Sequence, residues 1–166
     1  MNRREIIAGL GGAAAWPVVA RAQQGDRVRR IGVLMAGGEN DTNAYLSAFT
    51  QAIAGLGWTE GRNVRMDLRW GGGDINRIRA FAKELVGLQP DIILTRGTSA
   101  TLAVQPKTQT IPIVFANVGD PVASGIVPGL NRPGGNVTGF ANLEASLGGK
   151  WLELLSEIVR GKVAKK

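Results

Sequence analysis

The chain alternates short apolar runs with segments whose apolar residues recur at helical spacing, and this alternation constrains its fold more than any other feature. The apolar runs occupy residues 28–35, 92–95, 113–116 and 137–140, whereas residues 64–70 alternate apolar with charged residues, as in a half-exposed strand near a sheet edge. Runs of this length predict strands, and helices between successive strands predict a parallel sheet covered on both faces. The predicted fold class is therefore α/β, with a doubly wound parallel sheet.

The predicted helices each carry one apolar face. The first extends to about residue 55 and can be capped by Asp41 or Thr42. Its apolar face consists of Tyr45, Phe49, Ile53 and Leu56. The next helix begins at the cap Asp74, and a third opens at Gly97. The last, over residues 143–159, has on one side Leu147, Trp151, Leu154, Leu155 and Ile158.

Residues 1–22 have the pattern of an export signal. Arg3 and Arg4 precede an apolar run over residues 6–20, and the sequence Ala-Arg-Ala at 20–22 fits a cleavage site. The paired arginines favour a twin-arginine signal, with the general secretory route as the alternative. An uncleaved anchor is a second alternative. A dinucleotide fingerprint at residues 9–14 is disfavoured because no strand precedes it and Pro17 interrupts the helix that it needs.

Composition narrows the function. The chain has no histidine and no cysteine, which removes the commonest general base and the usual metal ligands. We therefore predict no enzyme activity, no metal and no cofactor. The net charge of +7 lies mainly at the two ends of the chain, in Arg3, Arg4 and Arg21 and in Arg160, Lys162, Lys165 and Lys166. A nucleic-acid-binding protein would cluster such residues on a folded face, so no nucleic-acid partner is predicted.

Ligands of open α/β sheets bind at the carboxyl ends of the strands, near a switch in strand order. This rule selects the loops 36–41, 96–100 and 117–121. The candidate ligand-binding residues in them are Gly38, Glu39, Gly97, Thr98, Ser99, Ala100, Asn117 and Asp120. Gly97 allows close backbone approach, and the hydroxyls and N–H groups at a helix start suit a carboxylate.

Each candidate also has a structural interpretation. Thr98 or Ser99 can cap its own helix, and Asp120 can cap the segment after Pro121. Asn117 can bond within its loop, and Glu39 can be a solvated loop charge. The sequence leaves these alternatives open.

Several motifs, taken in order, carry a family resemblance. The strongest is IPIVFANVGDPVASGIVPGLNRPGGNVTG at residues 111–139, in which a short helical segment is expected after Pro121 and a turn at 131–136. The others are GLGWTEGRN at 55–63, the loop 97–100, and a helix whose residues 151–155 read WLELL. Together they resemble the substrate-binding proteins of ABC importers, of the tryptophan- and tyrosine-binding type.

The resemblance implies a flavodoxin-like lobe of a type I periplasmic binding protein. It implies three parts: a signal peptide at 1–22, an N-terminal solute-binding lobe at 23–142, and a helix at 143–166 towards a hinge and second lobe, with the chain apparently truncated there. The implied function is periplasmic capture of an amino-acid-like or other small carboxylate solute for an inner-membrane permease, or a non-functional fragment of such a protein. The exposed final helix predicts self-association.

Two other function classes fit the same fold: a cytoplasmic effector-binding regulatory lobe and a flavodoxin-like enzyme. The leader argues against the first, and the missing histidine and phosphate-binding motifs argue against the second. The identity of the solute is not encoded in any motif.

Overall fold

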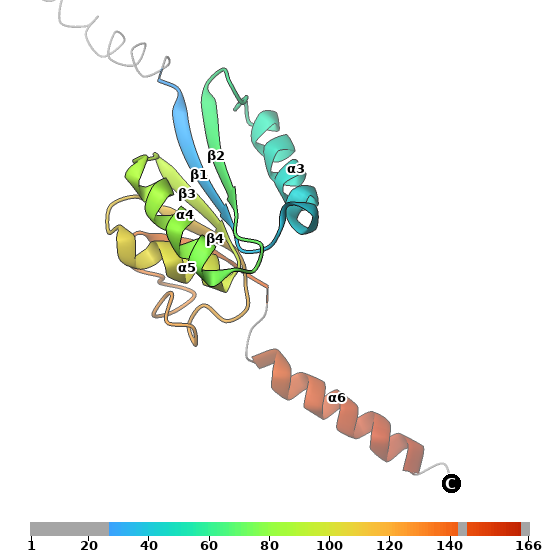
Figure 1. The fold of residues 1–166 in the computed structure, drawn as a ribbon. Coiled ribbons are helices and arrows are strands. Elements are labelled where there is room, and N and C mark those ends of the chain that lie inside the picture. Colours follow the sequence, from blue (N-terminus) through green and yellow to red (C-terminus); the bar gives the residue numbers. More distant parts are fainter. Residues whose placement is uncertain (1–26, 143–145, 164–166) are drawn as a thin grey trace, which may run out of the picture.

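The computed structural model describes residues 27–142 and 146–163, which form a parallel sheet with helices on both faces and one projecting helix (Figure 1). In chain order the elements are β1 (Arg29–Met35), α3 (Glu39–Gly55), β2 (Val64–Trp70), α4 (Ile75–Gly87), β3 (Ile92–Arg96), α5 (Thr98–Val104), the 3-10 turn η1 (Gln105–Lys107), β4 (Ile113–Val118), β5 (Val137–Ala141) and α6 (Ser146–Val163). The predicted α/β class is confirmed. The predicted leader lies outside the described residues.

The order of the strands places β1 inside the sheet. The order is β2-β1-β3-β4-β5, and every neighbouring pair is parallel. The chain moves from β1 to one side to form β2 and then crosses to the other side to form β3. Right-handed crossovers therefore place α3 on one face of the sheet and α4 and α5 on the other, as Figure 1 shows. The order reverses between β1 and β3, so the switch point of the sheet lies there.

The face covered by α4 and α5 contains the core. Leu34, Ile93 and Phe115 from the strands pack with Ile78 and Leu85 from α4, and all five are at most 2% exposed. Helix α4 begins as predicted, because the side chain of Asp74 accepts hydrogen bonds from the backbone N–H groups of residues 76 and 77. This face is a close-packed layer that holds the strands in register.

The face covered by α3 is less complete. Thr42 is the only buried residue of α3, whereas Tyr45 is 56% and Leu56 is 78% exposed. The helix also starts earlier than predicted, at Glu39, since Gly38 takes the cap position and the hydroxyl of Thr42 bonds back to the carbonyl of Gly38 at 2.8 Å. The predicted cap at Asp41 or Thr42 is thus wrong, and the predicted apolar face is only partly covered.

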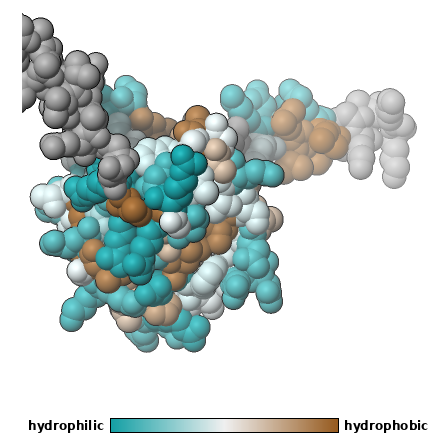
Figure 2. All heavy atoms as spheres, turned by 90° about the horizontal axis from the view of Figure 1, so that it is seen from above, coloured by the Kyte–Doolittle hydropathy of each residue, from teal (hydrophilic) through white to brown (hydrophobic). Residues whose placement is uncertain are grey.

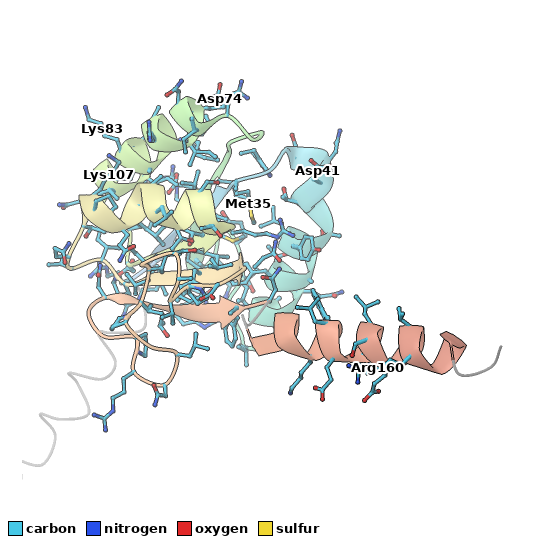
Figure 3. All side chains as sticks on the ribbon, turned by 90° about the horizontal axis from the view of Figure 1, so that it is seen from below. Met35, Asp41, Asp74, Lys83, Lys107 and Arg160 are labelled. Atoms are coloured by element: carbon cyan, nitrogen blue, oxygen red, sulfur yellow. The ribbon has the colours of Figure 1, made fainter. Side chains whose placement is uncertain are left out.

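Helix α6 projects away from the sheet (Figures 1 and 3). Its residues 148–160 are all exposed, and hydrophobic side chains are visible along it in Figure 2. Trp151, Leu154, Leu155 and Ile158 are each more than half exposed. No helix within the described ranges is both long and apolar enough to cross a membrane.

Asp91 ties the amino end of β3 to β1, and its removal should destabilise the fold. One carboxylate oxygen accepts the backbone N–H of Arg30 at 2.8 Å and the other accepts from Arg29 at 3.0 Å, while the N–H of Asp91 donates to the carbonyl of Arg30. Asp91→Ala leaves a half-buried N–H without its acceptor, so we expect a loss of about 1–3 kcal/mol in the free energy of unfolding, measured by urea titration. Asp91→Asn keeps an acceptor and should lose less.

The same contacts make the free energy of unfolding depend on pH. The hydrogen bond from the Arg30 N–H, followed by that from Arg29 and the charges of Arg27 and Arg29, holds the pKa of Asp91 below its usual range, although partial burial opposes this. A lowered folded-state pKa stabilises the fold above the unfolded carboxyl value of about 4, and the contribution is lost as pH falls through the lower folded value. The difference in the free energy of unfolding between wild type and Asp91→Asn should therefore become smaller as the pH falls from about 5 to 2. A constant difference over this window would contradict the assignment.

Candidate ligand-binding site

The loops after β1 and β3 are each hydrogen-bonded at their first residue to the neighbouring strand, β3 and β4 respectively, along the carboxyl rim of the sheet. The N–H of Ala36 donates to the carbonyl of Arg96 at 3.0 Å, and the N–H of Gly97 donates to the carbonyl of Ala116 at 3.0 Å. On the other side, the N–H of Gly72 donates to the carbonyl of Gly37 at 3.0 Å. Figure 3 views the molecule from this rim, and Met35 at the end of β1 lies between α3 and the layer of α4 and α5. The three predicted loops therefore lie next to the switch point.

Gly97 makes the tightest turn of this rim. It caps α5 with a φ of 94°, in the left-handed region that favours glycine, and a Cβ at this position would lie 3.0 Å from the Cβ of Ala36. The side chains of Thr98 and Ser99 are half-buried beside it, and the start of α5 has no side-chain cap. Their hydroxyls thus do not form the cap that was the structural alternative. Ala100 is fully buried, so its methyl belongs to the core and cannot line a site.

The hydroxyl of Thr101 fixes α5 to the sheet beneath this turn. It donates to the carbonyl of Gly97 at 3.0 Å and lies 2.9 Å from the hydroxyl of Thr95, and both threonines are fully buried. A buried hydroxyl pair that is bonded in this way positions the turn rigidly. The rim is therefore preorganised at Gly97.

In the β1 loop, Gly38 and Glu39 begin α3. Glu39 is exposed and lies in the first turn together with Asp41, where negative charge is favourable to the helix dipole. This arrangement supports the structural interpretation of Glu39 more than a contact with a ligand.

In the β4 loop, Asp120 and Asn117 are both engaged locally. One oxygen of Asp120 accepts the N–H groups of Val122 and Ala123 at 3.1 and 2.9 Å, so this carboxylate caps its own turn. The turn does not continue as the expected short helix, since Gly125 adopts a φ of 70°. Asn117 has a φ of 56° at a register shift of β4, and its amide oxygen accepts from Asn142 at 2.6 Å.

A cavity of about 330 Å³ opens at this rim on the α3 face of the sheet. It is lined by Met35, Tyr45, Phe49, Leu94, Arg96, Ala116, Asn117, Phe140, Ala141 and Asn142. The guanidinium carbon of Arg96 lies 3.7 Å from the centre of the Tyr45 ring, a cation–π contact. Sequence reasoning missed both residues. The signal that could have found Arg96 is a charged residue directly between an apolar strand and Gly97.

Two further cavities lie along α3 but away from the rim. One of about 610 Å³ separates α3 from β2 and is lined mainly by small residues such as Ala44, Ser47 and Ala48. Another of about 460 Å³ lies towards the amino ends of the strands, beside Ile31 and Ile92. Neither lies at the carboxyl ends of β1 and β3, whereas the cavity of 330 Å³ includes Asn117 of the predicted site. Within residues 27–142 and 146–163, no group of three or more acidic side chains has a spacing that could hold a metal ion.

Comparisons with known proteins find substrate-binding proteins. A family described as ABC transporter substrate binding protein matches residues 30–161. A tyrosine-binding protein of Clostridioides difficile (strain R20291) is 33% identical over 94 residues, which cover 57% of this chain and 27% of that protein.

Two solved structures share the fold. An ABC domain in complex with L-Trp from Streptococcus pneumonia matches with a TM-score of 0.65 and 26% identity, over 69% of this chain and 38% of that one. The ligand-free, open structure of a substrate binding protein with adhesive properties from Clostridium difficile matches with a TM-score of 0.69 and 29% identity, over 78% of this chain and 43% of that one. The chain thus spans less than half the length of the relatives that it matches.

Proposed function

The chain belongs to the family of ABC transporter substrate-binding proteins, and from this premise we propose that it captures a small carboxylate solute at the carboxyl rim of its sheet. In this proposal the protein is exported to the periplasm by residues 1–22, delivers the solute to an importer permease and performs no chemistry on it. The observation that carries the proposal is that the backbone hydrogen bonds at Ala36 and Gly97 hold the loops after β1 and β3 against the carboxyl ends of β3 and β4, beside the switch point.

The chemistry of the rim supports an anionic solute. Gly97 presents backbone without a side chain, and the hydroxyls of Thr98 and Ser99 stand beside it. Arg96 adds a positive charge to the adjoining cavity. A carboxylate accepts hydrogen bonds from all three kinds of group. The names of the relatives, a tyrosine-binding protein and a complex with L-Trp, add aromatic amino acids to the solutes to be tested.

The affinity of the described part should be low. The chain spans less than half the length of the relatives that it matches, so we expect the described part to cover a solute from one side only. Binding sites for small molecules usually bury about 70–90% of the ligand. We therefore expect a dissociation constant in about the millimolar range.

An NMR titration of the full chain with L-tryptophan, L-tyrosine and small carboxylates tests the proposal. The amide signals of Gly38, Gly97, Thr98 and Ser99 should shift on addition of at least one solute. Ser99→Ala should weaken that solute, whereas Ser47→Ala, which lies in the cavity between α3 and β2, should not. If no rim signal moves up to about 10 mM solute, the proposed function is wrong.

We also propose that α6 mediates self-association. Its exposed residues Trp151, Leu154, Leu155 and Ile158 follow the spacing of one helix face, and an isolated helix of this length is only marginally stable in water. Leu155→Glu should lower the mass measured by light scattering at high concentration. Ser156→Glu should not, because Ser156 is the next residue along the helix and lies outside this face. Equal masses for both variants would exclude this face as the contact.

A further inference from the structure

We propose that Arg96 binds the carboxylate of a single-ring acid without an amino group, whose apolar body fills the cavity between α3 and β5. The inference rests on the proposed function and names its solute class. The observation behind it is a lone guanidinium at the carboxyl rim, inside a cavity whose other walls are mostly apolar.

Arg96 differs from the other arginines of the strands. Arg29 pairs with Asp91, Arg30 and Arg65 pair with Asp67, and Arg69 pairs with Glu84. Among the described residues Arg96 has no acidic partner, and its Nε is shielded from solvent without a hydrogen-bond acceptor. Buried polar groups are almost always hydrogen-bonded, so this donor requires an explanation. A bound anion in the cavity that Arg96 lines would supply the missing counter-charge for the guanidinium.

The position of Arg96 suits this role. It ends β3 on the α3 face, where it lies in register with Met35 of β1 and Ala116 of β4. Its stacking on Tyr45 holds the guanidinium plane in place, which leaves the N–H groups along its edge free to approach a carboxylate. The guanidinium therefore need not be reorganised when an acid binds.

The cavity also limits the shape of the ligand. Its volume of about 330 Å³ is at the lower end of the range for small-molecule sites, about 300–1,000 Å³. Phe49, Leu94 and Phe140 provide apolar and aromatic walls. The amide oxygen of Asn117 accepts from Asn142, and no acceptor within the described residues is bonded to its two N–H groups. A single ring with one carboxylate matches this set of groups.

A ligand amino group would find no acidic partner among the described residues of this cavity. Among residues 27–142 and 146–163, no aspartate or glutamate lines the cavity. The nearest loop carboxylate along the chain from Asn117, Asp120, caps its own turn, and Glu39 is exposed at the start of α3. An α-ammonium group next to Arg96 would be repelled, with no carboxylate of the described residues to compensate. Acids without an amino group should therefore bind more tightly than the matching amino acids.

The test compares three probes that share one ring: 3-phenylpropanoate, its neutral amide 3-phenylpropanamide, and L-phenylalanine. Their dissociation constants are measured by NMR titration with the full chain, for wild type, Arg96→Gln, Arg96→Lys and the control Arg79→Gln on the exposed surface of α4. Wild type and the control should prefer the acid over the amide by about tenfold or more. Arg96→Gln should remove this preference, and Arg96→Lys should keep part of it. L-phenylalanine should bind more weakly than 3-phenylpropanoate.

The outcomes separate this inference from the proposed function. If Arg96→Gln remains folded by circular dichroism and still prefers the acid, the role of Arg96 is wrong and the function stands. If L-phenylalanine binds more tightly than 3-phenylpropanoate, the solute is an amino acid and the inference is overturned. If wild type does not bind 3-phenylpropanoate but its rim amide signals shift with another solute, only this inference is overturned. A wild type that responds to no solute overturns both.

Phe140→Ala tests the cavity itself. Phe140 is 75% exposed, so its truncation should leave the fold intact. Because the ring forms an apolar wall, the variant should bind the acid and the amide more weakly by a similar factor. The ratio of their two dissociation constants should stay unchanged. If both probes bind Phe140→Ala as they bind wild type, the apolar body does not lie in this cavity.

Discussion

Gly139→Ala should destabilise the protein by about 3 kcal/mol or more, because a β-carbon at this position has no space. Gly139 of β5 is paired with Phe115 of β4. The added carbon would lie 2.1 Å from the carbonyl oxygen and 2.7 Å from the nitrogen of Phe115, and 2.6 Å from the first carbon of its ring. Two of these atoms belong to the backbone and cannot rotate away. The two strands would have to separate, which breaks hydrogen bonds between them.

The expected result is a large fall in the free energy of unfolding, measured by urea titration followed by circular dichroism. Gly87→Ala is the matched control, since a β-carbon there meets no atom within 4 Å and alanine favours the helix α4. A loss below about 1 kcal/mol for Gly139→Ala would show that β5 is not paired with β4 in this register.

Phe115→Ala should have the second large effect, a loss of about 3–5 kcal/mol. The ring of Phe115 is 2% exposed and belongs to the core between the sheet and α4 and α5. Removing the ring leaves a cavity that its neighbours cannot fill. Gly139, the residue paired with Phe115, has no side chain that could move into this space.

Phe140→Ala is the control for Phe115→Ala, because Phe140 is the same residue type on the neighbouring strand but lies on the α3 face of the sheet. It should lose about 0.5 kcal/mol or less in the same urea titration. Equal losses for the two variants would mean that the core is not on the α4 and α5 face. The double variant Gly139→Ala with Phe115→Ala should not recover stability, since the backbone contacts of residue 115 remain.

Local patterns predicted the strands well. The run at 113–116 corresponds to the first part of β4 (Ile113–Val118), because both faces of an inner parallel strand are apolar. The segment 64–70 corresponds to β2 (Val64–Trp70), where apolar residues alternate with charged ones as in an edge strand. Asp74 was a correct cap because its role depends on the next three residues only.

The sequence did not predict how α3 packs. Its periodic residues Tyr45 and Leu56 suggested a covered face, but the helix leaves them exposed and leaves cavities between itself and the sheet. Periodicity shows which side of a helix is apolar and not whether another element reaches that side. The cap at Gly38 was missed because Thr42, a good cap by residue type, bonds backwards from inside the helix instead.

For the candidate site, the general rule about strand ends placed the three loops on one rim, whereas the roles of single residues depended on tertiary contacts. Asp120 could be assigned to its own turn only after its two N–H donors were located. Arg96 was missed because its most informative property is the lack of an acidic partner among the described residues, and pairing across strands is not visible in a one-dimensional pattern.

The position of β2 and β5 at the two margins of the sheet has a consequence for solutions at high concentration. The margin at β2 carries Arg65, Asp67 and Arg69, and charged side chains oppose the addition of a further strand. The margin at β5 (VTGFA) carries no charge. Strand addition between copies should therefore join β5 to β5 about a two-fold axis. Such a contact closes on itself, so it would produce a pair and not a growing fibril.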